Sequence, residues 1–229
     1  MLNAMYAQVR RTLSLPGACA VICLAVVVAG VMRALAGLKF GVGDSAALNI
    51  IAPTTGLVLA VYVFAGLGVL VATMGYKTSE DLYLFLSTGS LKRFIGTQVG
   101  TSIFLVLASC VPVLGIYIVV EALGPNERGS LIPLSVGLIV SAVTFFWFGH
   151  VLTSAFGNPL ASLGVILLAP LIFTPQLERL NPQINALLPW SAVHETLYSG
   201  IGPNFLMTCS VWIVLFIVAH SLILGRWLR

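Results

Sequence analysis

The sequence predicts an all-α integral membrane protein that forms a single domain over residues 1–229. The chain is 59% hydrophobic and only 8% charged, whereas soluble domains carry about 25% charged residues. Such a chain cannot cover itself with polar surface, so water is the wrong solvent for most of it. Six apolar runs are about long enough to cross a bilayer. Because these runs do not alternate apolar and polar residues, they favour helices over the strands of a membrane barrel.

The chain begins with a basic amphipathic segment over residues 1–15. Its apolar residues recur at helical spacing on one face, namely Leu2, Met5, Tyr6, Val9 and Leu13. Arg10 and Arg11 lie off this face, and Pro16 breaks the helix before the first apolar run. A helix of this kind is expected to lie in the plane of the membrane interface, in contact with lipid.

The six expected spans follow in order. They cover residues 17–37, 52–75, 94–122, 133–156, 159–174 and 204–225. The fifth is short and contains Pro170, so we expect it to be kinked or to stop below the far surface. Residues 175–203 are too apolar for a free loop, and Pro182 and Pro189 divide them. We expect this segment to form short outer helices that re-enter the membrane or cap the spans before the last one.

The distribution of basic residues predicts the orientation. With the N-terminus in the cytoplasm, the inner segments hold seven bases: Arg10, Arg11, Lys77, Lys92, Arg93, Arg226 and Arg229. The outer segments hold Lys39, Arg128 and Arg179, together with Arg33, which is expected to snorkel outward from the first span. Cytoplasmic segments carry the excess of Lys and Arg, so both termini are expected in the cytoplasm of a cell (plasma or inner) membrane. This placement, and not a nucleic-acid partner, accounts for the net charge of +4.

A charged segment, residues 76–93, separates the second and third spans. Thr78 can cap a helix with Asp81 three residues later, and Gly89 is placed to end it. The pattern predicts a short cytoplasmic helix with an acidic N-terminus and an apolar face, suited to docking a soluble partner. The alternative is a surface helix that only closes the loop. The residues expected to contact a partner are Thr78, Ser79, Glu80, Asp81, Leu82, Phe85 and Leu86.

The overall plan resembles the permease subunits of ABC transporters of the ABC-2 exporter type. The shared layout is an N-terminal amphipathic helix, six spans, a helical loop after the second span, a tight turn between the fourth and fifth spans, and outer helices before the sixth. Two stretches carry the resemblance, "SEDLYLFLSTGSLKRFIGTQ" and "NALLPWSAVHETLYSG". The resemblance implies that residues 78–89 are a coupling helix seated in a separate ATP-binding subunit. It also implies a second permease, either a second copy or a sister chain, to enclose a path.

The chain has no G-x-x-x-x-G-K-[ST] phosphate-binding loop. We therefore expect no enzymatic activity and no bound cofactor in this chain, with ATP and Mg²⁺ held by the partner ATPase. Few charged residues lie within the spans, so the expected cargo is hydrophobic or amphipathic: a drug, a peptide antibiotic or a lipid.

Polar groups at membrane depth are the candidates for a translocation path. His150 lies deep in the fourth span, either in an interhelical hydrogen bond or in contact with cargo or a proton relay. Glu121 ends the third span, either as an interfacial residue or as part of a gate. His220 is expected at the interface, near the inner end of the last span. No metal site is expected, because "HETLY" at His194 lacks the second histidine of H-E-x-x-H.

Several rival functions fit the same composition. A haem-exporter-like permease of cytochrome assembly would need an additional membrane partner. A stand-alone secondary transporter or channel would need ion-coupling residues at the midplane, where Asp and Glu are scarce. An intramembrane enzyme would depend on His150 or Ser154. Glycines at 66, 68, 96 and 100 are expected to allow helices, or two protomers, to approach closely.

Overall fold

The computed structural model describes residues 2–37, 55–77, 85–123, 131–193 and 203–227. The helices in these parts of the chain are α1 Leu2–Leu13, α2 Pro16–Gly37, α3 Thr55–Lys77, α5 Leu91–Leu123, α6 Leu131–Phe156, α7 Pro159–Leu180, α8 Pro182–Ala186 and α10 Pro203–Trp227. Six of the helices are long and apolar enough to cross a membrane. The predicted all-α membrane class is therefore confirmed.

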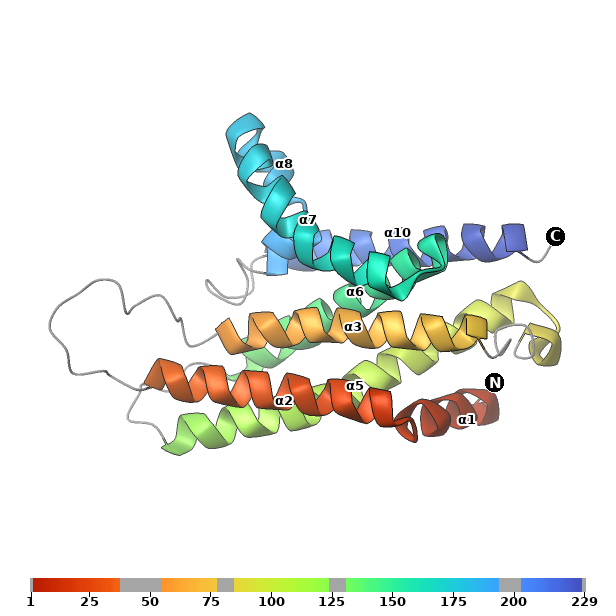
Figure 1. Ribbon diagram of the computed structural model, residues 1–229, viewed down its shortest axis with the longest axis horizontal. Coiled ribbons are helices and arrows are strands. Elements are labelled where there is room, and N and C mark those ends of the chain that lie inside the picture. The colour runs from red at the N-terminus through yellow and green to blue at the C-terminus, as the bar shows by residue number, and fades with distance from the viewer. Residues whose placement is uncertain (1, 38–54, 78–84, 124–130, 194–202, 228–229) are drawn as a thin grey trace, which may run out of the picture.

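Five of the expected spans agree with α2, α3, α5, α6 and α10 to within three residues at either end. The fifth span differs, because α7 continues to Leu180 instead of ending at residue 174. Pro170 and Pro175 lie inside α7, and its second half bends away from the other helices (Figure 1). A proline removes one hydrogen bond and crowds the preceding turn, which bends a helix without ending it. The kink was expected, whereas the early end was wrong.

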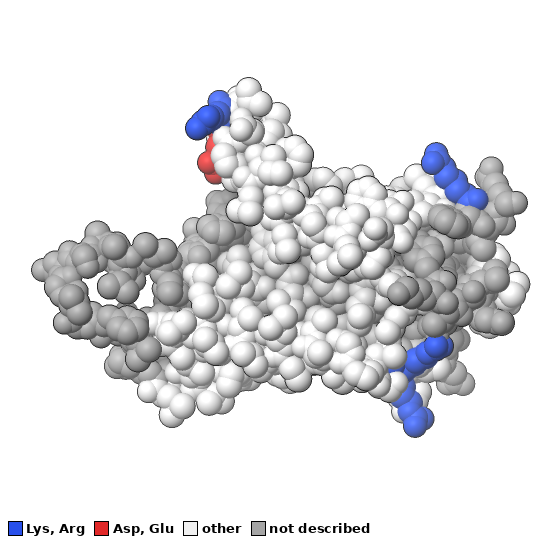
Figure 2. Space-filling model, in the orientation of Figure 1, with Lys and Arg blue, Asp and Glu red and all other residues white. Residues whose placement is uncertain are grey.

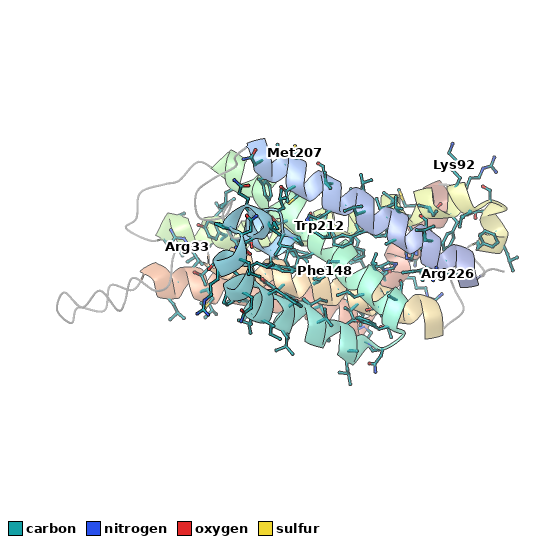
Figure 3. All side chains as sticks on the ribbon, turned by 90° about the horizontal axis from the view of Figure 1, so that it is seen from above. Arg33, Lys92, Phe148, Met207, Trp212 and Arg226 are labelled. Atoms are coloured by element: carbon teal, nitrogen blue, oxygen red, sulfur yellow. The ribbon has the colours of Figure 1, made fainter. Side chains whose placement is uncertain are left out.

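The spans lie side by side and run in alternating directions (Figure 1). The helix α1 lies beside the start of α2, at the end of the bundle where α3 ends, α5 begins and α10 ends. Bases lie at this end: Arg10 and Arg11 in the last turn of α1 and Arg226 in the last turn of α10. Lys92 is also at this end, whereas Arg33 is towards the other (Figure 3). The expected grouping of bases is thus present, and its assignment to the cytoplasmic side remains a prediction.

The most deeply buried helices are α3 and α6, which pack against each other. Within the membrane-crossing window of each helix, 72% of the α6 residues and 56% of the α3 residues are buried, against 17% for α7. A side chain on Gly68 would overlap the carbonyl oxygen of Phe146, and one on Gly149 would overlap that of Ala65. The two backbones therefore touch, which only glycine permits. Gly66, by contrast, faces open space.

The remaining helices surround this pair with large apolar side chains turned outward. The space-filling view shows a surface with few charges along the length of the bundle and coloured side chains near its ends (Figure 2). Exposed Leu24 and Val27 on α2, and Leu168 and Leu171 on α7, illustrate the pattern. Such a surface is suited to hydrocarbon and not to water.

Candidate functional site: a polar cluster and cavity inside the bundle

Three helices bring buried polar side chains together near the basic end of the bundle. His150 and Ser154 are one turn apart on α6, Gln98 comes from α5 and His220 from α10. All four are buried, with exposed fractions of 6% or less. Because polar groups inside a membrane protein are costly unless they are paired, such a cluster indicates either a structural network or a functional site.

His220 has hydrogen-bond partners on both ring nitrogens. Its Nε2 lies 2.6 Å from Oε1 of Gln98, and its Nδ1 lies 3.4 Å from Oγ of Ser154. Since the Gln98 oxygen is an acceptor, Nε2 carries the proton of a neutral ring. The one hydroxyl proton of Ser154 is directed to the His150 carbonyl at 2.9 Å, so its contact with Nδ1 is the weaker of the two. The expectation that His220 is interfacial was wrong. The α10 face that carries it is turned inward, against Trp147 and His150.

His150 differs from His220 in its hydrogen bonding. It is 5% exposed, and neither of its ring nitrogens has a partner in good hydrogen-bond geometry among the described residues. Its ring stacks on Phe146 and lies 4.7 Å, centroid to centroid, from the ring of His220. Nε1 of Trp147 is also buried without a hydrogen-bond partner. A weaker contact joins His150 to the backbone of Gly68 on α3. Both alternatives for His150, an interhelical hydrogen bond and contact with cargo, therefore stay predictions.

A cavity of about 90 Å³ lies beside these two side chains, between α1, α3, α5 and α6. Its lining includes Gln8, Arg11, Thr12, Leu15, Val71, Met74, Gly75, Gln98, Thr101, Ser102, Leu105, Phe146, Trp147 and His150. The hydroxyl of Thr101 donates to Oε1 of Gln8 at 3.1 Å, which joins α5 to α1 across the cavity wall. Since Arg11 is exposed, the cavity reaches the surface where α1 meets the bundle.

The lining of this cavity favours a ligand with hydrogen-bond acceptors. The Trp147 indole is a donor only, and a neutral imidazole such as His150 offers one donor and one acceptor. Arg11 adds a positive charge, and the lining includes no Asp or Glu among the described residues. Leaving buried donors without partners costs about 1–3 kcal/mol each, so the cavity is expected to hold water or a polar ligand.

A second hollow of about 350 Å³ lies at the other end, between α3, α7, α8 and Trp190. Its polar groups are largely satisfied by one another. The Trp190 indole donates to Oγ1 of Thr174 at 3.0 Å, and Ser191 donates to Oδ1 of Asn185 at 3.1 Å. Nδ2 of Asn185 lies 3.4 Å from a carboxylate oxygen of Glu178. These bonds tie the outer helical segment to α7 and need no further ligand.

The outer segment itself differs from the expectation in its first part. The short helices expected within residues 175–203 would have included Leu177 and Leu180. Both residues belong to α7 instead. Pro182 then begins α8, whose N-cap Asn181 accepts a hydrogen bond from the amide of Gln183 at 2.9 Å. A further helical turn follows from Pro189. The helical segments thus begin at Pro182 and Pro189, and their position relative to the membrane stays a prediction.

Of the expected coupling helix, the structure describes the last part. Its first five expected contact residues lie outside the described residues, namely Thr78, Ser79, Glu80, Asp81 and Leu82. Phe85 to Thr88 are helical, and Gly89 ends the helix with φ +67° and an N–H bond to the Phe85 carbonyl at 3.0 Å. The ring of Phe85 packs edge-to-face on Phe94 of α5 at 6.1 Å, whereas Leu86 is 64% exposed. The predicted role of Gly89 is confirmed.

Two charged residues near the other end have different outcomes. Glu121 lies in the last turn of α5, and its side chain lies outside the described part of the molecule. Arg33 is 3% exposed, with its guanidinium 5.4 Å from the centroid of the Tyr117 ring. The expectation that Arg33 snorkels to the surface was therefore wrong, because α2 turns it towards α5 and the aromatic face replaces solvent.

Sequence reasoning missed Gln98 and Trp147. A signal for Gln98 was present, since it is the only amide side chain in the third apolar run. The indole of Trp147 gave no such signal, because tryptophan is common in apolar helices. Among the described residues no group of three or more His, Cys, Asp or Glu side chains is arranged to hold a metal ion.

Comparison with models of protein families gives no match to this chain, and comparison with curated proteins gives none either. The resemblance to ABC-2 permeases therefore rests on layout and on the two stretches quoted above.

Proposed function

We propose that this protein is the permease subunit of an ABC exporter of the ABC-2 type. It moves a hydrophobic or amphipathic molecule, such as a drug, a peptide antibiotic or a lipid, across the cell membrane. A separate ATP-binding subunit holds ATP and Mg²⁺ and supplies the energy. A second copy of the chain, or a sister permease, completes the path, since symmetric pairs are the common solution for such assemblies.

One observation carries the proposal. The helical turn from Phe85 to Thr88 lies between α3 and α5, which end and begin at the basic end of the bundle. It turns Leu86 outward while Phe85 packs on Phe94, an α5 residue with no exposed surface. A partner bound to Leu86 would therefore transmit its movement through Phe85 and Phe94 to the membrane span α5. This arrangement supports mechanical coupling more than a helix that only closes a loop.

Three substitutions on the loop test this proposal. The intact protein, purified from its native membrane, is expected to carry an ATP-binding polypeptide with it. Glu80→Lys combined with Asp81→Lys is expected to abolish ATP-dependent export, because it reverses the charge of the proposed contact. Leu86→Asp is expected to release the ATPase by burying an unpaired charge in the contact. The matched control is Leu160→Asp in the first turn of α7, where the side chain is also exposed (78% against 64% for Leu86), and this variant is expected to keep the ATPase bound.

The same experiment separates the rivals. Export by the purified chain without any nucleotide would indicate a secondary transporter or channel and would contradict the proposal. A requirement for a further membrane partner, with loss of cytochromes when the gene is deleted, would indicate a haem exporter. A third outcome is that the loop substitutions leave export and ATPase binding unchanged. That result would refute only the assignment of residues 78–89 as a coupling helix.

A further inference from the structure

We propose that the cavity between α1, α3, α5 and α6 binds the compact, negatively charged head of an amphiphile, with His150 and Trp147 as its hydrogen-bonding residues. This inference deepens the proposed function by naming the class of cargo. That the bound ligand is also transported rests on the proposed function. The binding site itself stands on the geometry of this chain.

The first step concerns the buried polar atoms beside the cavity. Among the described residues, neither ring nitrogen of His150 nor Nε1 of Trp147 has a partner in good hydrogen-bond geometry. The adjacent His220, in the same helix bundle, has partners on both nitrogens. The fold is thus able to satisfy a histidine at this depth and does so for one of the two. Buried polar groups left without partners point to a missing water or ligand.

The second step concerns charge. The side chains that line the cavity include Arg11 and no carboxylate among the described residues. The Trp147 indole can only donate. The hydroxyls of Thr12, Thr101 and Ser102 on the same walls already donate to Gln8 and Val99. The donors that remain for an anion are Trp147 and His150, beside the charge of Arg11. A ligand rich in acceptor oxygens, such as a carboxylate or a phosphate, matches this set. A cationic head would meet a positive charge and donors with no acceptor charge opposite it.

The third step concerns size and access. A cavity of about 90 Å³ has room for several waters or a compact oxyanion, and it is too small for a whole lipid. Leu15, Val71 and Leu105 supply apolar wall next to the polar one, where the first carbons of a tail can lie. The helix α1 forms one side, and the hydrogen bond from Thr101 to Gln8 ties it to α5.

The position of α1 beside the cavity provides an entry route for the ligand. An amphipathic helix with Tyr6 67% exposed is suited to lie at the level of the lipid head groups. A head group that enters beside α1 meets Arg11 first and His150 and Trp147 deeper inside. The cavity is therefore placed to take an amphiphile from the inner leaflet when the basic end faces the cytoplasm.

Binding to the full-length chain in phosphatidylcholine nanodiscs, without an ATPase, tests the inference. The probes are radiolabelled dodecyl phosphate, inorganic phosphate and dodecyltrimethylammonium. We expect saturable binding of dodecyl phosphate, weakened about tenfold or more by His150→Leu and by Trp147→Phe, because each removes a hydrogen bond to a charged group. His150→Gln keeps a donor and an acceptor and is expected to retain binding.

The matched control is Trp212→Phe, whose indole donates to the Leu187 carbonyl at 2.7 Å near the opposite end, and which is expected to leave binding unchanged. Trp147→Phe keeps the aromatic packing, so a loss of binding in a variant with unaltered thermal unfolding reports on the lost donor. The inference is overturned if His150→Leu and Trp147→Phe both bind dodecyl phosphate like the parent protein. It is also overturned if inorganic phosphate binds equally well, which would indicate a free-ion site, or if the cationic amphiphile binds as tightly. Because no nucleotide is present, failure here leaves the export proposal to be judged on its own test.

Discussion

The helices α6 and α7 are neighbours in sequence, joined by a tight turn at Gly157 and Asn158, and yet they occupy opposite environments. Both are apolar enough to cross a membrane, but 72% of the α6 window is buried against 17% of the α7 window. The difference lies in small and polar residues and not in hydropathy. On α6, Ser141, Thr144 and Gly149 face the interior, whereas the outward face of α7 carries Leu and Ile.

This contrast follows from the physics of packing in lipid. Lipid tails are as apolar as leucine, so hydrophobicity does not hold one span against another. Close backbone approach and interhelical hydrogen bonds do, and the close approach is found where Gly149 of α6 and Gly68 of α3 meet. The helix α7 has few of these features and is expected to be solvated by lipid or by a second permease. Substitutions in the buried pair and on α7 test this contrast.

The largest effect is expected from Gly68→Leu. A side chain at this position would overlap the Phe146 carbonyl, and the backbones of α3 and α6 would have to separate. We expect the free energy of unfolding to fall by about 3 kcal/mol or more. The measurement is reversible unfolding in mixed micelles.

The control for this change is Gly66→Ala in the same helix, because a Cβ at Gly66 has no atom within 4 Å. Alanine also favours a helix over glycine by about 1 kcal/mol, so stability is expected to stay equal or rise slightly. Equal losses in Gly66→Ala and Gly68→Ala would contradict the α3 and α6 interface described here.

A smaller effect is expected from His220→Leu. The substitution leaves the Gln98 carbonyl buried without its 2.6 Å partner, which is expected to cost about 1–3 kcal/mol. His150→Leu, measured in the same way, is expected to cost less, because among the described residues the His150 nitrogens have no hydrogen bond in good geometry to lose. If His150→Leu proves the more costly of the two in the absence of ligand, the assignment of satisfied and unsatisfied histidines is reversed.

The smallest effect is expected from Leu171→Ala on α7. Leu171 is 72% exposed, so its removal leaves no cavity inside the protein, and the change in stability is expected to stay within about 0.5 kcal/mol. The matched change is Leu138→Ala on α6, where the side chain is fully buried and the loss is expected to be about 2 kcal/mol or more. Equal costs at the two sites would show that α7 is covered as well as α6 is.

The sequence predicted the helices well because their ends carry clear signals. Pro16 and Pro159 begin α2 and α7, and apolar runs of the required length lie between such signals. What it did not predict is which face of each helix turns inward, because helices that are apolar all round have no contrasting face. For this reason His220 and Arg33 were placed at the surface, and Gly66 and Gly68 were treated alike, although two residues separate an open position from a backbone contact.

The candidate site shows the same division. His150 was identified from its depth in an apolar run, whereas Gln98 and Trp147 became visible only when α5, α6 and α10 were brought together. The acidic part of the expected coupling helix was predicted from its capping pattern, and it stays a prediction.

The most direct test of the proposed coupling is a photo-crosslinking amino acid placed at Leu86 in intact cells. Leu86 is exposed beside the membrane spans at the basic end. We predict a covalent adduct with a cytoplasmic ATP-binding polypeptide, weakened when Glu80→Lys and Asp81→Lys are combined with it. Labelling of a cysteine at position 86 by a membrane-impermeant reagent added outside the cells would contradict the proposal.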